Sequence, residues 1–275
     1  VRADKKLSPD WVKSLFARGT PEVLRGSELK YVGMPVGGIG AGQLYLGGDG
    51  RLWHWDIFNQ EIRTGADHYA KPPIPTSPLT QKFTLKLGDR LVSLDRHGFS
   101  DVSFRGEYPI GIVEYADATV PLTVKLEAFS PFIPLNTNDS SLPATVLQFT
   151  LRNSSTAPVE TMLSGELENG VCLNHRVRDG VLRNRIVRES GLTALLCSAE
   201  ESTSPASPRP QTNSVDSNQP NHAGPLKDLP DFGTLVLALV GEAANQADGD
   251  ATAPFTGKLS GLLGRKFKLA PGESA

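Results

Sequence analysis

Apolar and polar residues alternate along most of the chain after about residue 25. Segments 122–129, 145–151 and 159–167 place an apolar side chain at nearly every second position, which is the period of a half-buried β-strand. Glycine, proline and aspartate separate such segments, as turns require. Further strands are predicted at 43–46, 51–58, 83–87, 181–188, 192–198 and 267–269, and the apolar run 234–240 predicts a buried strand. We therefore predict an all-β fold, an antiparallel β-sandwich.

Helical signals are confined to the start of the chain. Ser8-Pro9-Asp10 supplies an N-cap hydroxyl, a proline at the first helical position and an acidic group in the first turn. The apolar stripe from Trp11 to Phe16 ends before Gly19, which predicts a short amphipathic helix. Thr20-Pro21-Glu22 repeats the start signal, so we expect a second helical turn there. Residues 1–28 are then a helical lead-in to a single domain spanning 1–275.

Two segments depart from the strand pattern. Residues 201–230 hold six prolines, five serines and few apolar residues, so they cannot bury enough surface to offset the entropy of ordering. We predict a surface insertion between two strands. Near the end, Pro271-Gly272 supplies a turn, but only three residues follow, too few for a strand that returns along the sheet. We therefore expect the natural chain to continue beyond Ala275.

The charge balance excludes some partners. Lys and Arg total 28 against 30 Asp and Glu, so the net charge of −2 creates no field that attracts nucleic acid or an anionic membrane. No apolar run approaches the roughly 18 residues of a membrane span. Residues 1–6 contain no apolar signal region, so any targeting signal is absent or removed, and the compartment stays open. Cys172 and Cys197 are too few for a disulfide scaffold, and whether they pair also stays open.

A glycine-rich segment, residues 37–42, is the most unusual feature of the composition. It precedes a hairpin rather than a helix and lacks the Gly-Lys-Ser/Thr ending of a phosphate-binding loop, so nucleotide binding is disfavoured. Glycine is the residue of tight backbone crossings. A loop packed against a ligand or a second domain would give the same pattern, and both interpretations stay open.

The segment Trp53-His54-Trp55-Asp56 comes next. In a regular strand the two indoles share one face, and His54 and Asp56 share the other. The indoles could stack on sugar rings, and a His–Asp pair could transfer protons. Alternatively, the tryptophans fill a core or an interface.

Other candidate constellations are incomplete. Glu166 and Glu168 would lie near the roughly 6.5–9.5 Å carboxylate separation of an inverting glycosidase, but same-face acids on a strand are usually solvated. Cys172, His175 and Cys197 do not complete a tetrahedral zinc set. We therefore assign no catalytic, cofactor-binding or metal-binding residue.

Three segments resemble a known family. Residues 31–42 leading into 52–56, residues 128–143 and residues 165–169 are similar, in this order, to the N-terminal domain of glycoside hydrolase family 116. That family includes non-lysosomal glucosylceramidase, also called bile-acid β-glucosidase. The resemblance implies a β-sandwich followed by an (α/α)6 helical domain, which carries the glutamate nucleophile and the aspartate acid/base for retaining hydrolysis of β-glucosides.

No segment of this sequence corresponds to the helical domain, so the resemblance places no catalytic residue here. It implies that the fragment alone is inactive and that its partners are a C-terminal catalytic domain of the same polypeptide and that enzyme's carbohydrate or glycolipid substrate. The residues expected at the domain interface or pocket rim are Met34, Pro35, Gly37, Gly38, Gly40, Gly42, Trp53, His54, Trp55, Asp56 and Asn59. The alternatives are a free-standing carbohydrate-binding module that stacks sugars on Trp53 and Trp55, and a small inverting hydrolase built on Glu166 and Glu168.

Overall fold

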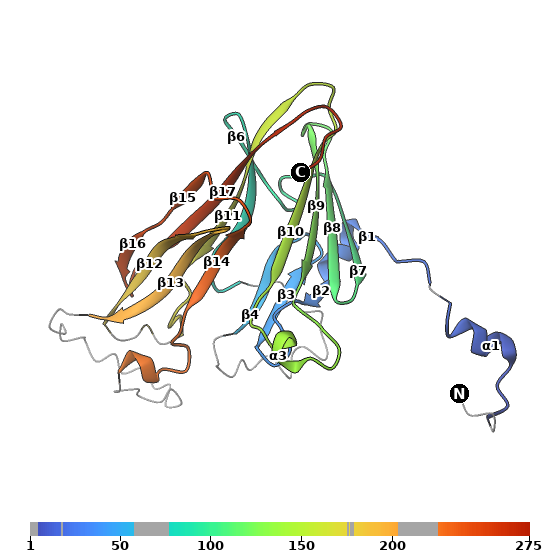
Figure 1. Ribbon diagram of the computed structural model, residues 1–275, viewed down its shortest axis with the longest axis horizontal. Coiled ribbons are helices and arrows are strands. Elements are labelled where there is room, and N and C mark those ends of the chain that lie inside the picture. Colours follow the sequence, from blue (N-terminus) through green and yellow to red (C-terminus); the bar gives the residue numbers. More distant parts are fainter. Residues whose placement is uncertain (1–4, 18, 58–76, 175, 177–178, 203–224) are drawn as a thin grey trace.

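Antiparallel β-strands make up most of the computed structural model (Figure 1), which describes residues 5–17, 19–57, 77–174, 176, 179–202 and 225–275. All the strand pairs among these residues are antiparallel. The all-β prediction is therefore confirmed. The expected insertion at 201–230 falls largely on residues outside the described ranges, as do Asn59 and His175.

The strands form four sheets, which we call A to D. Sheet A has the order β1-β7-β8-β9-β10 and sheet B the order β2-β3-β4. Their bounds are Leu24–Arg25 (β1), Asp101–Glu107 (β7), Ile110–Ala116 (β8), Leu122–Phe129 (β9), Val146–Asn153 (β10), Gly33–Pro35 (β2), Gln43–Gly47 (β3) and Leu52–Asp56 (β4).

Sheet C has the order β15-β17-β11-β5-β6 and sheet D the order β14-β13-β12-β16. Figure 1 shows C and D on one side of the molecule and A and B on the other. Their bounds are Gln246–Asp248 (β15), Ser260–Leu269 (β17), Val159–Glu168 (β11), Gln81–Leu87 (β5), Arg90–Ser93 (β6), Leu235–Val240 (β14), Leu192–Glu201 (β13), Gly180–Glu189 (β12) and Ala251–Pro254 (β16).

The sheets bury their apolar faces against one another. Leu46 of sheet B lies so close to Gly111 of sheet A that a Cβ on that glycine would stand 2.6 Å from its side chain. The rings of Phe83 in sheet C and Phe149 in sheet A have centroids 4.8 Å apart. Leu195 of sheet D occupies the space beside Gly261 of sheet C. The simple two-sheet sandwich that we expected is therefore replaced by four sheets, because alternation shows which side of a strand is buried but not which strands pair.

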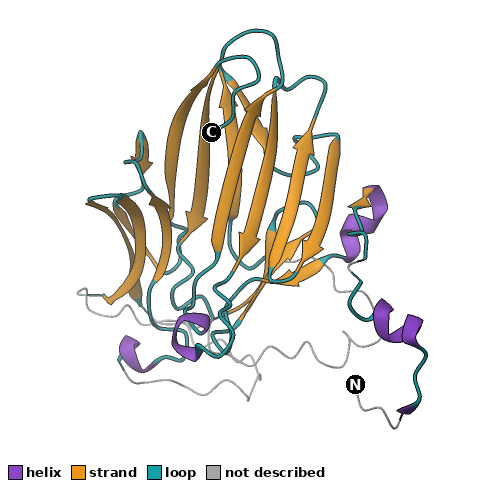
Figure 2. Ribbon diagram, turned by 45° about the vertical axis from the view of Figure 1, so that its right-hand side comes forward, coloured by secondary structure: helices purple, strands orange, loops and turns teal. Residues whose placement is uncertain are grey.

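The described helices are short. They are α1 (Pro9–Ser14), α3 (Thr137–Ser140) and the 3-10 helices η2 (Gly26–Tyr31) and η3 (Leu226–Asp228), and Figure 2 shows them at the ends and edge of the sheets. Helix α1 begins where the sequence predicts, with the Ser8 hydroxyl accepting from the Trp11 amide at 3.2 Å. None of its residues is buried. Among the described residues, no helix is long and apolar enough to cross a membrane.

The second helical turn expected near residues 20–24 is wrong. Leu24 instead pairs with Phe104 at the edge of sheet A, so a tertiary strand pairing overrides the local start signal. The interpretation of 234–240 as a fully buried strand is also wrong, because β14 is the outer strand of sheet D and Val236 and Val240 are exposed.

The end of the chain returns along sheet A. After the turn at Gly272, the backbone of Ala275 and that of Leu151 in β10 exchange two hydrogen bonds of 2.9 Å. The amide of Asn153 donates to the carbonyl of Glu273, also at 2.9 Å. The last residues therefore cover the outer edge of β10, and the expectation that three residues are too few to return along the sheet is wrong.

Candidate functional site

The glycine-rich segment, residues 37–42, packs against a loop about a hundred positions later, residues 131–143. The Ile39 amide donates to the Ser140 carbonyl at 3.1 Å, and the Thr145 hydroxyl donates to the Val36 carbonyl at 2.6 Å. Gly38 has φ +94, and a Cβ there would stand 2.5 Å from the Leu142 carbonyl oxygen. Glycine is required at this position because the two backbones touch, which supports the tight-crossing interpretation.

The same segment also meets the end of β4. Gly42 has φ +103, and a Cβ there would lie 2.7 Å from the Asp56 carbonyl oxygen. A Cβ on Gly37 would lie 2.9 Å from backbone atoms of Gly42 and Leu44. Gly40 also has a left-handed backbone, but no neighbour lies near it. Three of the four predicted glycines are thus explained by close backbone approach.

Local hydrogen bonds hold the 131–143 loop in shape. Asn136 caps α3 by accepting from the Asp139 amide at 3.1 Å. The Ser140 hydroxyl both accepts from the Ile133 amide at 2.9 Å and donates to the Ile133 carbonyl at 3.0 Å. These bonds close the loop on itself, so its apolar side chains are left pointing outward.

Six exposed apolar side chains, five on these two segments and Tyr108 on the β7–β8 turn, form what we call the glycine-loop face. Ile39 and Leu142 come from the two touching loops, Leu135 is fully exposed, and the ring of Tyr108 lies 5.7 Å from that of Phe132. Such exposed apolar groups are typical of interaction surfaces. Pattern reasoning missed the later members, since the prolines around them break the strand period. The face consists of Ile39, Tyr108, Phe132, Ile133, Leu135 and Leu142.

The predicted arrangement of the Trp53–Asp56 segment is wrong. Tyr45 of β3 pairs with Trp53 of β4, and Gln43 pairs with Asp56. The two paired positions are two residues apart in β3 but three residues apart in β4. β4 therefore carries an extra residue, a β-bulge, and His54 adopts φ 58. The bulge places Asp56 on the same face as Trp53 and turns Trp55 to the opposite face.

Both indoles are buried as a result. Trp53 is 3% exposed and lies across Gly33 and Gly47, while Trp55 is 5% exposed and belongs to the main core. Two buried indoles on opposite faces cannot form a stacking platform, so the carbohydrate-binding module that we considered is not supported. Met34 is partly buried against Gly111, and Pro35 is exposed on the outer strand of sheet B.

Glu166 and Glu168 have structural partners. Glu166 forms an ion pair of 2.9 Å with Lys82. The Glu168 carboxylate accepts from the Thr80 amide at 2.9 Å and lies 3.4 Å from Lys258 Nζ. Burial raises the pKa of Glu168, but these bonds outweigh burial, so its pKa is lowered overall. A glycosidase general acid needs a raised pKa, which Glu168 does not have.

The cysteines and the potential metal ligands form neither a disulfide nor a cluster within the described ranges. Within the described ranges, Cys172 and Cys197 are both buried and form no disulfide, and no group of three or more His, Cys, Asp and Glu side chains gathers closely enough for a metal. Burial raises the pKa of the Cys197 thiol to about 12. Cys197 is therefore protonated at neutral pH and unsuited to act as a nucleophile.

Comparison with known families identifies the domain in which these loops lie. The family model described as beta-glucosidase 2, glycosyl-hydrolase family 116 N-term, matches residues 33–224, well over half of the chain. The chain belongs to this family. The resemblance seen in the sequence is thus confirmed, and both loops of the glycine-loop face lie inside the matched part of the family 116 N-terminal domain. A search of curated proteins found no match.

Proposed function

We propose that this family 116 domain is non-catalytic and that its glycine-loop face docks a helical catalytic domain of the same polypeptide. The observation that carries the proposal is the meeting of two distant loops to present exposed apolar side chains at one end of the sheets. Burying a leucine or isoleucine stabilises an interface by about 1.5–3 kcal/mol. A face with several such side chains is suited to permanent docking.

Catalysis is assigned to the docked domain. The candidate acids of this chain, Glu166 and Glu168, are held in ion pairs and backbone hydrogen bonds. The partner domain would then supply both carboxylates for retaining hydrolysis of β-glucosides. Its substrate would be a carbohydrate or a glycolipid, as the family resemblance implies. In this proposal the β-sheet domain supports the partner, and Met34–Gly42 approaches the rim of its pocket.

Catalytic assignment is tested with the 275-residue chain and an aryl β-glucoside. We expect no release of the phenol above that of a Glu168→Gln variant. Turnover by the chain that is lost in the variant would overturn the non-catalytic assignment.

Docking is tested in the polypeptide that carries this domain together with its helical domain. An Ile133→Asp/Leu135→Asp variant places two carboxylates in the glycine-loop face and should weaken docking by about 3 kcal/mol or more. Calorimetry should then show the two domains unfolding in separate transitions. Leu91→Asp is the matched control, because Leu91 is 68% exposed on β6, away from α3 (Figure 1). Unchanged unfolding in the double variant would contradict docking at this face.

A further inference from the structure

An open cavity of about 490 Å³ lies at the other end of the β3–β4 hairpin from the glycine loop. It is lined by the hairpin turn 47–51, the end of η2, residues leading into β5 and the loop that holds Arg96 and His97. Small-molecule sites commonly have volumes of about 300–1,000 Å³. The cavity is therefore large enough for a small metabolite, and it is separate from the glycine-loop face.

Its charge is predominantly positive. Lys30, Arg51 and Arg96 line it, and Asp49 is the one acidic side chain among its lining residues. Asp49 forms an ion pair with Arg51, and the Arg51 Nε donates to the Asp49 carboxylate at 2.8 Å. Neither Lys30 nor Arg96 forms an ion pair with any described residue, and the Lys30 ammonium lies over the Tyr31 ring, 4.7 Å from its centroid. Two exposed cations therefore lie at the cavity rim without a carboxylate partner in the described part of the chain.

Unpaired donors lie in the same wall. The indole Nε1 of Trp53 and the amide Nε2 of Gln81 are buried, and neither has an acceptor among the described residues. Both residues line the cavity. Gly47 lies beside the indole, where a Cβ would stand 2.9 Å from Nε1, so the wall at this point is backbone and ring. Buried donors without acceptors are costly, and a ligand rich in acceptor oxygens would match this wall.

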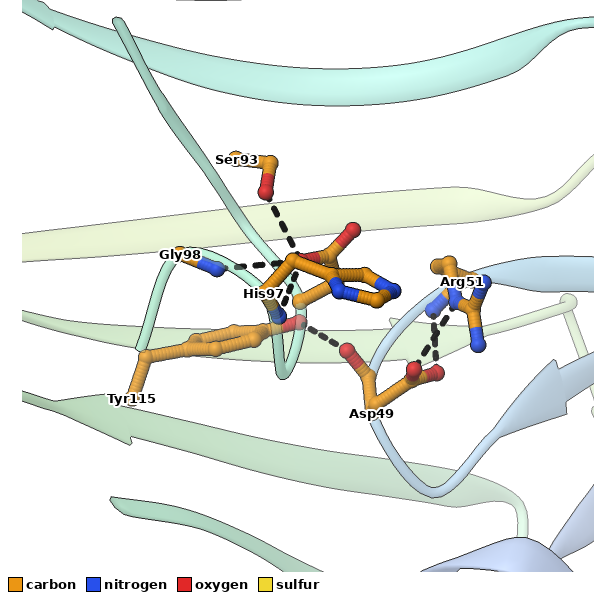
Figure 3. Close-up of polar contacts among 7 residues, drawn as sticks. Asp49, Arg51, Ser93, His97, Gly98 and Tyr115 are labelled. Atoms are coloured by element: carbon orange, nitrogen blue, oxygen red, sulfur yellow. Dashed lines mark hydrogen bonds and ion pairs between the residues drawn. The ribbon is translucent and has the colours of Figure 1, made fainter. Parts of the chain in front are cut away.

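The walls are held in place before any ligand arrives. The buried Tyr115 hydroxyl donates to the Asp49 carbonyl at 3.1 Å and anchors the hairpin turn. One carboxylate oxygen of Asp95 accepts from the Ser93 hydroxyl and the His97 amide, both at 2.7 Å. Figure 3 shows the His97 ring extending toward Arg51 above this anchored turn. A preformed site loses less entropy on binding.

From these observations we infer that the cavity binds the oxyanion group of a small molecule, either a phosphate ester or a carboxylic acid. Arg96 and Lys30 supply positive charge that has no carboxylate partner within the described ranges, and Arg51 presents a guanidinium fixed by Asp49. A neutral sugar would leave both cations without an anionic partner, so an anionic ligand fits better. This inference does not depend on the proposed docking function.

The test is a titration of the 275-residue chain, labelled with ¹⁵N, with inorganic phosphate and separately with citrate, at constant ionic strength. The chain has three indole N–H groups, on Trp11, Trp53 and Trp55. We expect the Trp53 indole signal to shift as anion is added until the site is saturated. The signals of Trp11 on α1 and Trp55 in the core serve as internal controls. A response to phosphate alone assigns a phosphate ester, and a response to citrate alone assigns a carboxylic acid.

Charge variants complete the test. Lys30→Gln/Arg96→Gln should weaken binding by about tenfold or more, because two charge-assisted contacts are lost. Arg185→Gln, an exposed arginine of β12, is the matched control and should change affinity less than about twofold. If the double variant loses its dispersed spectrum, Arg96→Gln alone is titrated. Absence of any Trp53 shift with both anions, or equal affinity in the rim and control variants, would overturn the inference.

Discussion

Gly38 and Gly40 share one loop and a left-handed backbone but differ in their surroundings. Only Gly38 has another backbone against it, since a Cβ there would stand 2.5 Å from the Leu142 carbonyl oxygen. Gly40→Ala should therefore cost about 1 kcal/mol from backbone strain alone. Gly38→Ala should cost about 3 kcal/mol, because the two loops must also move apart. Urea unfolding measures both, and equal losses would show that the loops do not press on each other.

Glu168 makes a pH-dependent contribution to the free energy of unfolding. Its folded-state pKa is lowered from 4.5, so its carboxylate favours folding above that pH, and the benefit is lost as pH falls through the folded-state value. Glu168→Gln should lower the free energy of unfolding by about 2 kcal/mol at pH 7 and by less at acidic pH. Glu160→Gln on the same strand is the control, since that exposed pair with Lys268 contributes little. A gap that widens on acidification would contradict this assignment.

Among the elements, β10 has an outer edge that depends on the last residues of the chain. The amides of Leu151 and Asn153 donate to Ala275 and Glu273. Ala275→Pro removes the donor that bonds the Leu151 carbonyl, so hydrogen exchange at the Leu151 amide should accelerate about tenfold. The Thr150 amide faces β9 by alternation and should be unaffected. Equal protection at Leu151 in both proteins would mean that the edge is stable without this pairing.

Strands are easier to predict from this sequence than their partners. The glycines at residues 47–50 predict the hairpin turn, and Gly50 does have φ +84. The period of two also locates β9, β10 and β11. Strand pairing is not predictable, because apolar alternation does not identify which strand lies next to which. The His54 bulge is hidden for a related reason: Trp-His-Trp-Asp alternates perfectly, and only the register with β3 shows the extra residue.

For the candidate site, composition identifies the glycine loop but not what it touches. The contact between this loop and residues 131–143 is a tertiary contact that no local sequence pattern predicts, although both segments carry the family resemblance. The cationic cavity is invisible to pattern reasoning, because Lys30, Arg51 and Arg96 are ordinary surface residues in sequence and converge only after four segments fold together.

Across the whole molecule, sheets A and C are joined through the rings of Phe83 and Phe149. Replacing each by leucine, singly and together, should give a coupling energy of about 1 kcal/mol in unfolding measurements. The same cycle with Phe83 and Phe255 should be additive, since Phe255 packs beside Gly180 in another part of the structure. Coupling of zero between Phe83 and Phe149 would indicate that the two sheets unfold independently.

The β3–β4 hairpin can lose a residue from β4 and keep its register, because β4 carries one residue more than β3 between its paired positions. Between the Tyr45–Trp53 and Gln43–Asp56 pairs, one strand has a residue more than the other. Deleting His54 would leave one residue between the pairs on each strand, so Trp55 would stand opposite Leu44 in a regular strand and Asp56 would stay opposite Gln43. Loss of the extra residue would therefore remove the bulge, while both indoles keep the faces that they occupy now.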